Sequence, residues 1–340
     1  MKTIIILLLL LTACTPVPNT GTFSIKVTDI NTTLPDPETC KDNGPDLTLT
    51  AFDVGQGQSV LIDLPYEHNL LFDAGPGIRN YGNQLRNKYI KYLVLSNPDR
   101  DHIGGTPFLA GIADIENVWT PITDKVCETK TCEEVRKSID DEFINNPPKV
   151  PCGINYKYDS NEEPQCSTTP QLGNSLLLRG THTINITYAF IDKCARVQAL
   201  TQERIGNITT LNPQITPFNN DNDDSIVLWI NYRGKNVLLM GDCEKRCEQA
   251  ILKNGNYPRN VDILLAGHHG SRTSSSQEFV NAINPKNVII SAGLNNQYGH
   301  PHQEAIDRFN RIGANIYRTD LNGSIHVVTN GENIQITTGD

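Results

Sequence analysis

An apolar, strand-like segment at residues 93–95 ends abruptly in a loop that is rich in metal-binding side chains. The loop places Asp99, Asp101 and His102 within four residues, and two glycines follow that let the backbone turn sharply. Carboxylates and an imidazole on a loop after a buried strand suit a divalent cation such as zinc or manganese. The loop therefore predicts a metal site at the end of a strand.

Three later segments repeat this pattern, in which an apolar strand is followed by side chains of the types that bind metals. The side chains that follow these strands are Asp242, His268, His269 and His300. Taken singly, Asp242 can also be interpreted as a helix cap and His268 as a hydrogen-bonded core histidine. Four such clusters in one chain favour a shared metal centre.

The first residues have the features of an export signal. Residues 1–13 contain one lysine, a short apolar run and small residues before Cys14, which predicts a signal peptide. The run is shorter than the ~20 residues that span a bilayer. The position of Cys14 resembles a bacterial lipobox, although an ordinary signal peptide is the alternative. We expect an exported bacterial lipoprotein that is lipidated at Cys14, with a tether at residues 14–46 and no transmembrane helix in the mature chain.

The chain has nine cysteines, and the eight that remain beside Cys14 suggest disulfides in an exported protein. Three pairs are candidates: Cys127 with Cys132, Cys152 with Cys166, and Cys40 with Cys194. Cys243 and Cys247 are one helical turn apart, which is awkward geometry for a bridge inside a regular helix.

The order of the expected elements predicts an α/β domain at residues 47–335. Strands come first in each half, and strands that alternate with helices follow. Two packed sheets with helices outside would accommodate this order. Residues 120–220 hold many cysteines, prolines and asparagines, and we interpret them as a disulfide-rich insertion rather than an independent domain.

The motifs and their order resemble the metallo-β-lactamase fold and, within it, the extracellular hydrolase domain of the competence protein ComEC. The matching segments are residues 52–59, 72–76, 97–105, 222–225, 241–242, 268–271 and 296–301. This resemblance implies an αββα four-layer sandwich with a cysteine-rich insertion. It also implies metal-assisted hydrolysis, in which an activated water attacks a phosphoryl or acyl centre.

In the wider fold, a His-x-His-x-Asp-His loop supplies two neighbouring metal sites. The ComEC type has aspartate at the second position, which matches Asp99, whereas Asn97 replaces the first histidine in this chain. A neutral carboxamide is a weaker zinc ligand than imidazole. We expect one well-formed site and a second, weak one. The ligands that the resemblance implies are Asp99, Asp101, His102, Asp242 and His268.

Other polar residues receive roles from the same resemblance. Asp73 is expected to orient a metal ligand. The expected catalytic residues are Asp99 or Asp101, which would orient the water, and His269 or His300, which would protonate the leaving group. His300 is alternatively an additional metal ligand. The serines at 271 and 274–276 would either hydrogen-bond a phosphate or cap a helix, and capping is favoured for the run.

These observations predict a metal-dependent phosphodiesterase or nuclease-like hydrolase. The net charge of −9 argues against a general grip on nucleic acid and favours a small phosphoester over a long polyanion. The main alternative is a non-catalytic binding or assembly module with a partly degenerate metal centre, marked by Asn97. An antibiotic-hydrolysing lactamase fits the export signal but not the details of the motifs.

Overall fold

The computed structural model describes residues 46–64, 69–120, 134, 175–177, 183–191, 200–211 and 220–339. The expected signal peptide, Cys14 and the tether up to residue 45 lie outside these residues. The three candidate disulfides at positions 40 to 194 also lie outside them. In the part of the chain that the structure describes, no helix has the length and apolar character needed to cross a membrane.

The described strands form two sheets. The first has the strand order β15-β14-β1-β2-β3-β4-β5-β6. Its strands are β1 (Leu47–Ala51), β2 (Val60–Asp63), β3 (Leu70–Phe72), β4 (Tyr89–Val94), β5 (Asp114–Thr120), β6 (Ser175–Leu177), β14 (Ile325–Thr329) and β15 (Ile334–Thr338). The second has the order β13-β12-β11-β10-β9-β8-β7. Its strands are β7 (Thr183–Ile191), β8 (Leu200–Thr210), β9 (Leu228–Tyr232), β10 (Lys235–Leu239), β11 (Ile263–Leu265), β12 (Asn287–Ile290) and β13 (Asn315–Arg318).

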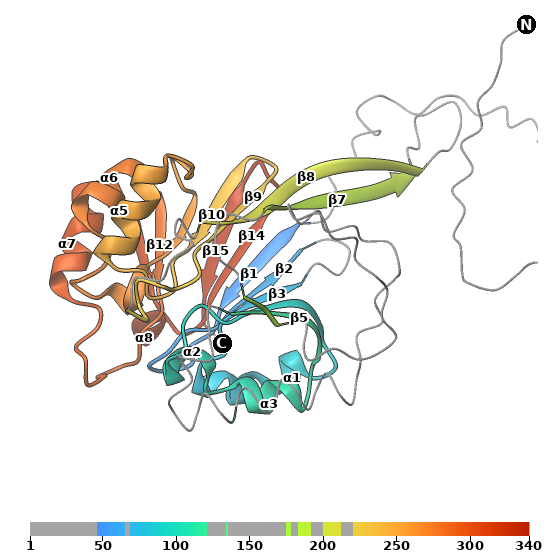
Figure 1. Ribbon diagram of the computed structural model, residues 1–340, viewed down its shortest axis with the longest axis horizontal. Helices are drawn as coiled ribbons and strands as arrows, with labels where there is room; N and C mark the ends of the chain where they lie inside the picture. Colours follow the sequence, from blue (N-terminus) through green and yellow to red (C-terminus); the bar gives the residue numbers. More distant parts are fainter. Residues whose placement is uncertain are drawn as a thin grey trace, which may run out of the picture.

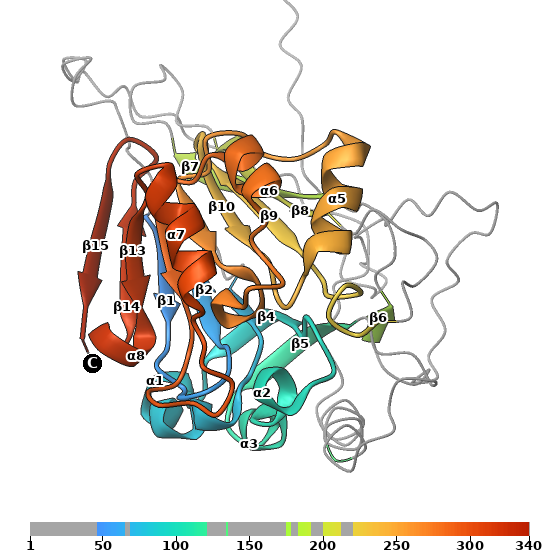
Figure 2. The same ribbon diagram turned by 90° about the vertical axis from the view of Figure 1, so that its left-hand side faces the viewer.

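Helices cover the outer face of each sheet (Figures 1 and 2). Beside the first sheet lie η2 (Pro76–Tyr81), α1 (Gly82–Leu85), α2 (Arg100–Ile103) and α3 (Thr106–Ala110). The second half of the chain supplies α5 (Lys245–Asn254), η3 (Gly267–Gly270), α6 (Gln277–Ile283), α7 (Gln303–Arg311) and α8 (Thr319–Asn322).

Three hydrophobic cores show that the molecule has four layers. Because successive side chains of a strand point to opposite faces, each sheet can bury both of its faces. One core lies between the sheets and includes Phe72 and Leu239. A second packs Leu71 of β3 against the helices of the first half, and a third packs Leu264 of β11 against α5, α6 and α7. This arrangement is the predicted αββα sandwich.

The segment that was interpreted as an insertion contributes strands to both sheets. β6 lies at the edge of the first sheet, and β7 and β8 form a hairpin at the edge of the second. β8 pairs with β9 through the register Gly206↔Tyr232 to Thr210↔Leu228, and Figure 1 shows the hairpin extending away from the helices. The range 120–220 is therefore partly integrated into the sandwich.

The expectation about Cys243 and Cys247 is wrong, because the structure contains a disulfide between them. The Cα atoms are 5.5 Å apart, which lies inside the ordinary range for a disulfide. The bridge is possible because α5 begins only at Lys245, so Cys243 lies in the turn before the helix. The disulfide thus joins the turn that carries Asp242 to the first turn of α5.

Glu248 of α5 is a buried carboxyl group that accepts hydrogen bonds from the backbone N–H groups of Ser275 and Ser276, the latter at 2.9 Å. Burial raises the pKa of Glu248 from 4.5 to about 7, although these N–H groups and the charge of Arg308 oppose the shift. The folded protein therefore binds a proton more tightly at this group than the unfolded chain does.

From this shift we expect the free energy of unfolding to fall as the pH rises from 4.5 to about 7. The contribution of Glu248 is at most about 3 kcal/mol, present below the unfolded pKa and lost as the pH passes the folded pKa. Urea unfolding across this range should show a flatter pH dependence for Glu248→Gln than for the wild type. The exposed Glu278 provides the control, Glu278→Gln. If the free energy of unfolding depended on pH equally in Glu248→Gln and in the wild type, Glu248 would not be the group that causes this dependence.

Candidate metal centre

The topology brings the predicted site residues to one edge of the sandwich. β3 and β4 are parallel in the first sheet, and β10, β11 and β12 are parallel in the second. Loops at the carboxyl ends of parallel strands meet at the same edge of a sheet, where ligands commonly bind. These loops carry Asp73 after β3, Asp101 after β4, Asp242 after β10, His269 after β11 and His300 after β12.

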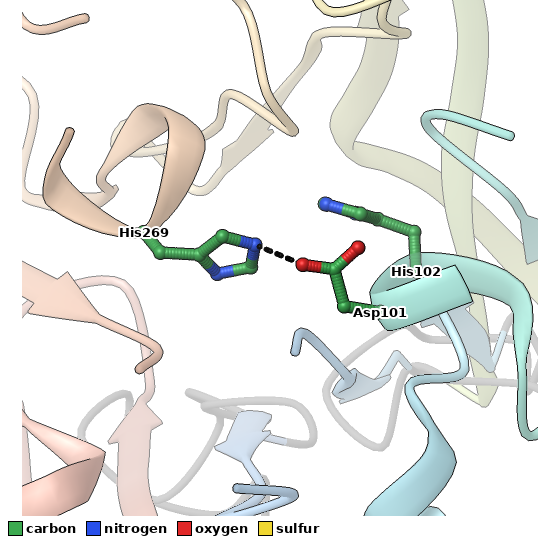
Figure 3. Close-up of side chains that lie close together, drawn as sticks. All are labelled: Asp101, His102 and His269. Atoms are coloured by element: carbon green, nitrogen blue, oxygen red, sulfur yellow. Dashed lines mark ion pairs between the residues drawn. The ribbon is translucent and has the colours of Figure 1, made fainter. Parts of the chain in front are cut away.

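Four side chains from these loops meet at short distances, and we call them the metal group: Asp101, His102, Asp242 and His269. His102 Nε2 lies 3.0 Å from Asp242 Oδ1. His269 Nε2 lies 3.3 Å from Asp101 Oδ2 and 3.7 Å from Asp242 Oδ1. Figure 3 shows the His269 ring and the Asp101 carboxylate pointing toward each other from different elements. His102, Asp242 and His269 are buried, whereas Asp101 is partly exposed to the pocket.

The donor atoms of this group fit a divalent cation. One ligand atom each from Asp101, His102 and His269 lies within 4.8 Å of the others. Among the described residues, three buried atoms here have no hydrogen-bond partner: Nε2 of His102, Nε2 of His269 and Oδ1 of Asp242. Buried polar atoms without partners are rare and call for an explanation. A cation held by these four side chains would satisfy all three atoms.

Asp73 fixes the orientation of His102 from behind. Nδ1 of His102 donates a hydrogen bond to Asp73 Oδ2 at 2.7 Å, so Nε2 is left to face Asp242. Asp73 also accepts hydrogen bonds from Gln58 Nε2 at 2.8 Å and from the backbone N–H of Ser96 at 2.6 Å. A carboxylate that orients a histidine in this way is a common support for metal ligands. Asp73 thus lies where the sequence analysis expects an orienting side chain.

The charges in the centre are strongly coupled. Burial alone would lower the pKa of His102, but the carboxylates of Asp242 and Asp73 raise it well above its usual value. The pKa of His269 is raised in the same way by Asp242 and Asp101, against the effect of burial. Burial would raise the pKa of Asp242, but His102 and His269 hold it well below its usual range. The site therefore concentrates negative charge that protons or a metal cation can neutralise.

Two adjacent histidines point to different partners. His268 and His269 both have positive φ angles, 47° and 53°, so the backbone turns sharply between Gly267 and Gly270. His269 Nδ1 donates to the Ser291 carbonyl at 2.8 Å, which directs Nε2 to Asp101. The structure thus groups His269, for which the sequence suggested proton transfer, with Asp101 and His102.

His268, which the sequence analysis named as a metal ligand, lies beside this group. Its Nδ1 donates to Glu244 Oε1 at 2.9 Å, and its Nε2 lies 3.8 Å from Asp242 Oδ2. Glu244 also accepts a hydrogen bond from Thr273 Oγ1 at 2.6 Å. Sequence reasoning missed Glu244, and its only signal is the position two residues after Asp242.

Asn97 shapes the loop that carries the ligands. Its Oδ1 accepts a hydrogen bond from the backbone N–H of Asp99 at 2.6 Å, and its Nδ2 donates to Asn222 Oδ1 at 3.3 Å. Both ends of the buried carboxamide are therefore engaged within the protein. Asp99 lines the pocket, where partial desolvation and the nearby Asp101 raise its pKa.

We expect Asn97→His to strengthen the weaker metal position, because imidazole binds zinc better than a carboxamide does. Metal content measured by mass spectrometry should rise from about one to about two ions per chain. Asn97→Ala is the control, since it removes the carboxamide without adding a ligand. An unchanged metal content in Asn97→His would contradict the expectation that this loop can complete a second position.

His300 lies beside the metal group and lines the same pocket. Its ring centroid is 5.3 Å from that of His268 and 6.2 Å from that of His269. Burial and the two neighbouring histidines lower the pKa of His300 to about 4. Its Nδ1 has no hydrogen-bond partner among the described residues.

The serines near the centre have mainly structural partners. Ser276 Oγ accepts a hydrogen bond from the backbone N–H of Phe279 at 3.4 Å, which confirms the helix-capping interpretation for this residue. Ser274 Oγ donates to the Gly267 carbonyl at 2.6 Å, and Ser271 Oγ lies 2.8 Å from Thr273 Oγ1.

A pocket of about 870 Å³ opens over the metal group. Besides the acidic and imidazole side chains, its wall includes Gln56, Arg100, Asn296 and Tyr298. A volume of this size accommodates a ligand of nucleotide dimensions.

Comparison with known proteins identifies relatives in bacterial competence. No family model matches the chain. It is 27% identical to competence protein ComA of Neisseria gonorrhoeae over 85% of its own length and 33% of that protein. It is 32% identical to recombination protein 2 of Haemophilus influenzae over 83% of its length and 29% of that protein. It is also 40% identical to ComE operon protein 3 of Bacillus subtilis over 34% of its length and 15% of that protein.

The chain is a ComEC-like homologue of these proteins. It has the metallo-β-lactamase fold that its motifs predict, a metal-dependent hydrolase-like fold. Among solved structures, YhfI of Bacillus subtilis, described as a metallo-β-lactamase fold protein, aligns with a TM-score of 0.48 and 11% identity. This alignment covers 84% of the ComEC-like chain and 100% of YhfI. The ComEC-like chain spans at most about a third of the length of its curated relatives.

Proposed function

We propose that this chain is an exported, lipid-anchored, metal-dependent phosphodiesterase with nuclease-like chemistry. The observation that carries the proposal is a set of buried atoms on His102, His269 and Asp242 that have no hydrogen-bond partner among the described residues and lie 3.0–3.7 Å from a neighbouring ionisable group of the same cluster, beside Asp101. The similarity to recombination protein 2 of Haemophilus influenzae supports a substrate related to nucleic acid, because recombination acts on nucleic acid. The net charge of −9 favours a short or small phosphodiester over a long duplex.

Asp101, His102, Asp242 and His269 would hold the cation in this proposal. When bound, a divalent cation lowers the pKa of a water molecule and stabilises negative charge on a phosphoryl oxygen. The protein itself must orient the water and the substrate. Asp99 is exposed to the pocket next to these ligands, so its carboxylate can accept a hydrogen bond from the attacking water.

His300 has a more limited role than a general acid in this proposal. Because its pKa is lowered to about 4, its imidazole is neutral near pH 7. A neutral imidazole can donate one N–H hydrogen bond to a substrate oxygen. His300 lines the pocket, so this hydrogen bond can orient the leaving group while the proton comes from solvent.

The export signal and the lipid anchor remain proposals that rest on the sequence of residues 1–14. The short apolar run followed by Thr12-Ala13-Cys14 supports removal of the signal peptide and lipidation of Cys14. In this proposal the protein lies in the bacterial cell envelope outside the cytoplasm, and the lipid is its membrane anchor.

The second candidate function is a non-catalytic binding or assembly module. Asn97 favours it, because the residue that replaces a metal-binding histidine is engaged in shaping its loop. The retained group of Asp101, His102, Asp242 and His269 favours the enzyme instead.

One experiment separates the two functions. The purified chain is analysed for bound divalent metal and assayed with a chromogenic phosphodiester and with single-stranded DNA in the presence of manganese. Bound metal and cleavage of either substrate support the enzyme. A chain that holds no divalent metal and cleaves neither substrate would support the binding module.

A further inference from the structure

An exposed tyrosine lies on the wall of the metal pocket. Among the described residues, the exposed large hydrophobic side chains are Leu294, Tyr298, Leu321 and Val328. Tyr298 is the aromatic one, is 53% exposed, and lines the same pocket as Asp101 and His269. A tyrosine offers a rigid, flat surface for contact with a ligand.

The side chain of Asn296 makes four hydrogen bonds to the backbone of the loop that carries Tyr298. Asn296 Nδ2 donates to the carbonyl oxygens of Gly293 at 2.8 Å and His300 at 2.5 Å. Asn296 Oδ1 accepts hydrogen bonds from the backbone N–H groups of Tyr298 at 3.1 Å and His300 at 3.0 Å. The backbone that carries Tyr298 is therefore positioned before a ligand binds.

A second contact ties this loop to the opposite half of the chain. The backbone N–H of Gly293 donates to Gln56 Oε1 at 3.2 Å. A side chain at Gly293 would collide with the backbone of Gln56, so the two loops pack closely. A preorganised surface loses less conformational entropy on binding.

The ring of Tyr298 continues a series of rings that begins at the metal group. Tyr298 stacks on His300 with centroids 5.7 Å apart and an interplanar angle of 24°. His300 in turn stacks on His269 with centroids 6.2 Å apart and an angle of 25°. These near-parallel planes lead from a proposed metal ligand to the exposed tyrosine. The nucleobase next to a phosphate that is bound at the metal group can stack on these rings.

The pocket also contains a positive group. Arg100 is exposed and lines the pocket beside Asp101. Its charge suits a phosphate next to the one that is cleaved. Each nucleotide of a nucleic acid carries a phosphate and a flat base. The pocket offers Arg100 to the phosphate and Tyr298 to the base.

We propose that Tyr298 stacks on a nucleobase of the substrate and thereby selects phosphodiesters that carry a base beside the cleaved phosphate. The inference rests on the proposed phosphodiesterase function and deepens it by naming the substrate class. Base–aromatic stacking tolerates any base, so the selection is for nucleotides in general and not for one sequence.

The test compares two substrates and three variants. The substrates are a short oligothymidylate and an oligomer of the same length with abasic sites in place of the bases. Tyr298→Ala should raise KM for the oligothymidylate by about 5- to 150-fold with little change in kcat, which corresponds to the usual strength of base stacking. KM for the abasic oligomer should stay the same. Tyr298→Phe, which keeps the ring, should behave like the wild type.

Val328→Ala is the control, because Val328 is also an exposed hydrophobic residue but lies on β14 and not in the pocket wall. It should leave both KM values unchanged. An equal effect of Tyr298→Ala on both oligomers, or no effect on either, would overturn the inference while the proposed function stands.

If the wild type cleaves neither oligomer, that result counts against the proposed function and not against the stacking inference. A binding measurement then tests the inference. Fluorescence anisotropy with labelled oligomers in EDTA reports binding without cleavage. Tighter binding of the oligothymidylate than of the abasic oligomer by the wild type, lost in Tyr298→Ala, supports stacking. Equal affinities for the two oligomers in the wild type would overturn it.

Discussion

Replacement of His269 by alanine is expected to empty the metal centre and to lower kcat/KM for a phosphodiester by about 1,000-fold or more. The reason is that His269 Nε2 lies 3.3 Å from Asp101 Oδ2 and 3.7 Å from Asp242 Oδ1 and has no hydrogen-bond partner in the part of the chain that the structure describes. Without this imidazole, the cation would lose one of four ligands. Metal content by mass spectrometry and steady-state kinetics with manganese measure the two effects.

The neighbouring histidine provides a discriminating comparison. His268 is held by Glu244 and lies beside Asp242, so His268→Ala should reduce activity but retain most of the bound metal. His326→Ala is the control outside the site, because His326 lies on β14 and contacts Thr50 and Gly339. If His268→Ala lost the metal and His269→Ala kept it, the assignment of the two rings would be reversed.

Much of the sandwich is predictable because its strands carry strong local patterns. The alternation in β1 buries Leu47, Leu49 and Ala51 and leaves the residues between them partly exposed. The hairpin of β9 and β10 is signalled by Arg233-Gly234, whose positive φ angles of 49° and 83° suit a two-residue turn. The parallel strands β11 and β12 are short runs, apolar apart from Asn287 at the start of β12, and each is followed by a loop that contains glycine.

The strands β6, β7 and β8 are harder to predict for a physical reason. The residues around them are rich in proline, asparagine and cysteine, which indicates loops, although the strands themselves contain no proline or cysteine. β8 nevertheless buries Ile208 against the core and continues the second sheet beyond β9. Its place depends on pairing with a distant strand, which local periodicity does not encode.

The sequence indicates the residue types of the metal group, but it does not indicate which of the two adjacent histidines belongs to it. The resemblance implied that Asp101, His102 and Asp242 lie together, and the loops after the parallel strands bring them to the same edge. Which of two adjacent histidines joins them depends on the positive φ angles of the turn and on the Ser291 carbonyl. The role of Asn97 also depends on a distant partner, Asn222. Such contacts follow from the tertiary fold and have no local sequence signal.

Asp73→Asn should weaken metal binding by about 10- to 100-fold, because it disturbs the group that orients His102. The Asp73 carboxylate is fully buried and accepts hydrogen bonds from Gln58 Nε2, the N–H and Oγ of Ser96, and His102 Nδ1. An amide in its place has one accepting oxygen and turns an NH₂ group toward donors. Asparagine tolerates the positive φ of 63° at this position, so the change tests the hydrogen bonds and not the backbone.

We also expect Asp73→Asn to lower the free energy of unfolding by about 2–4 kcal/mol, since buried donors lose a charged partner. Metal titration and urea unfolding with EDTA measure the two effects separately. Asp262→Asn is the matched control, because Asp262 is another buried carboxylate, which accepts hydrogen bonds from the backbone N–H of Asn236 at 2.9 Å and from Lys286 Nζ at 2.8 Å.

The control lies just before β11, at the opposite end of that strand from His269, so Asp262→Asn should lower stability and leave metal affinity unchanged. If both variants lost stability and Asp73→Asn kept its metal affinity, Asp73 would have a structural role only. A loss of affinity in Asp73→Asn alone would show that the hydrogen bond to His102 Nδ1 sets the geometry of the metal centre.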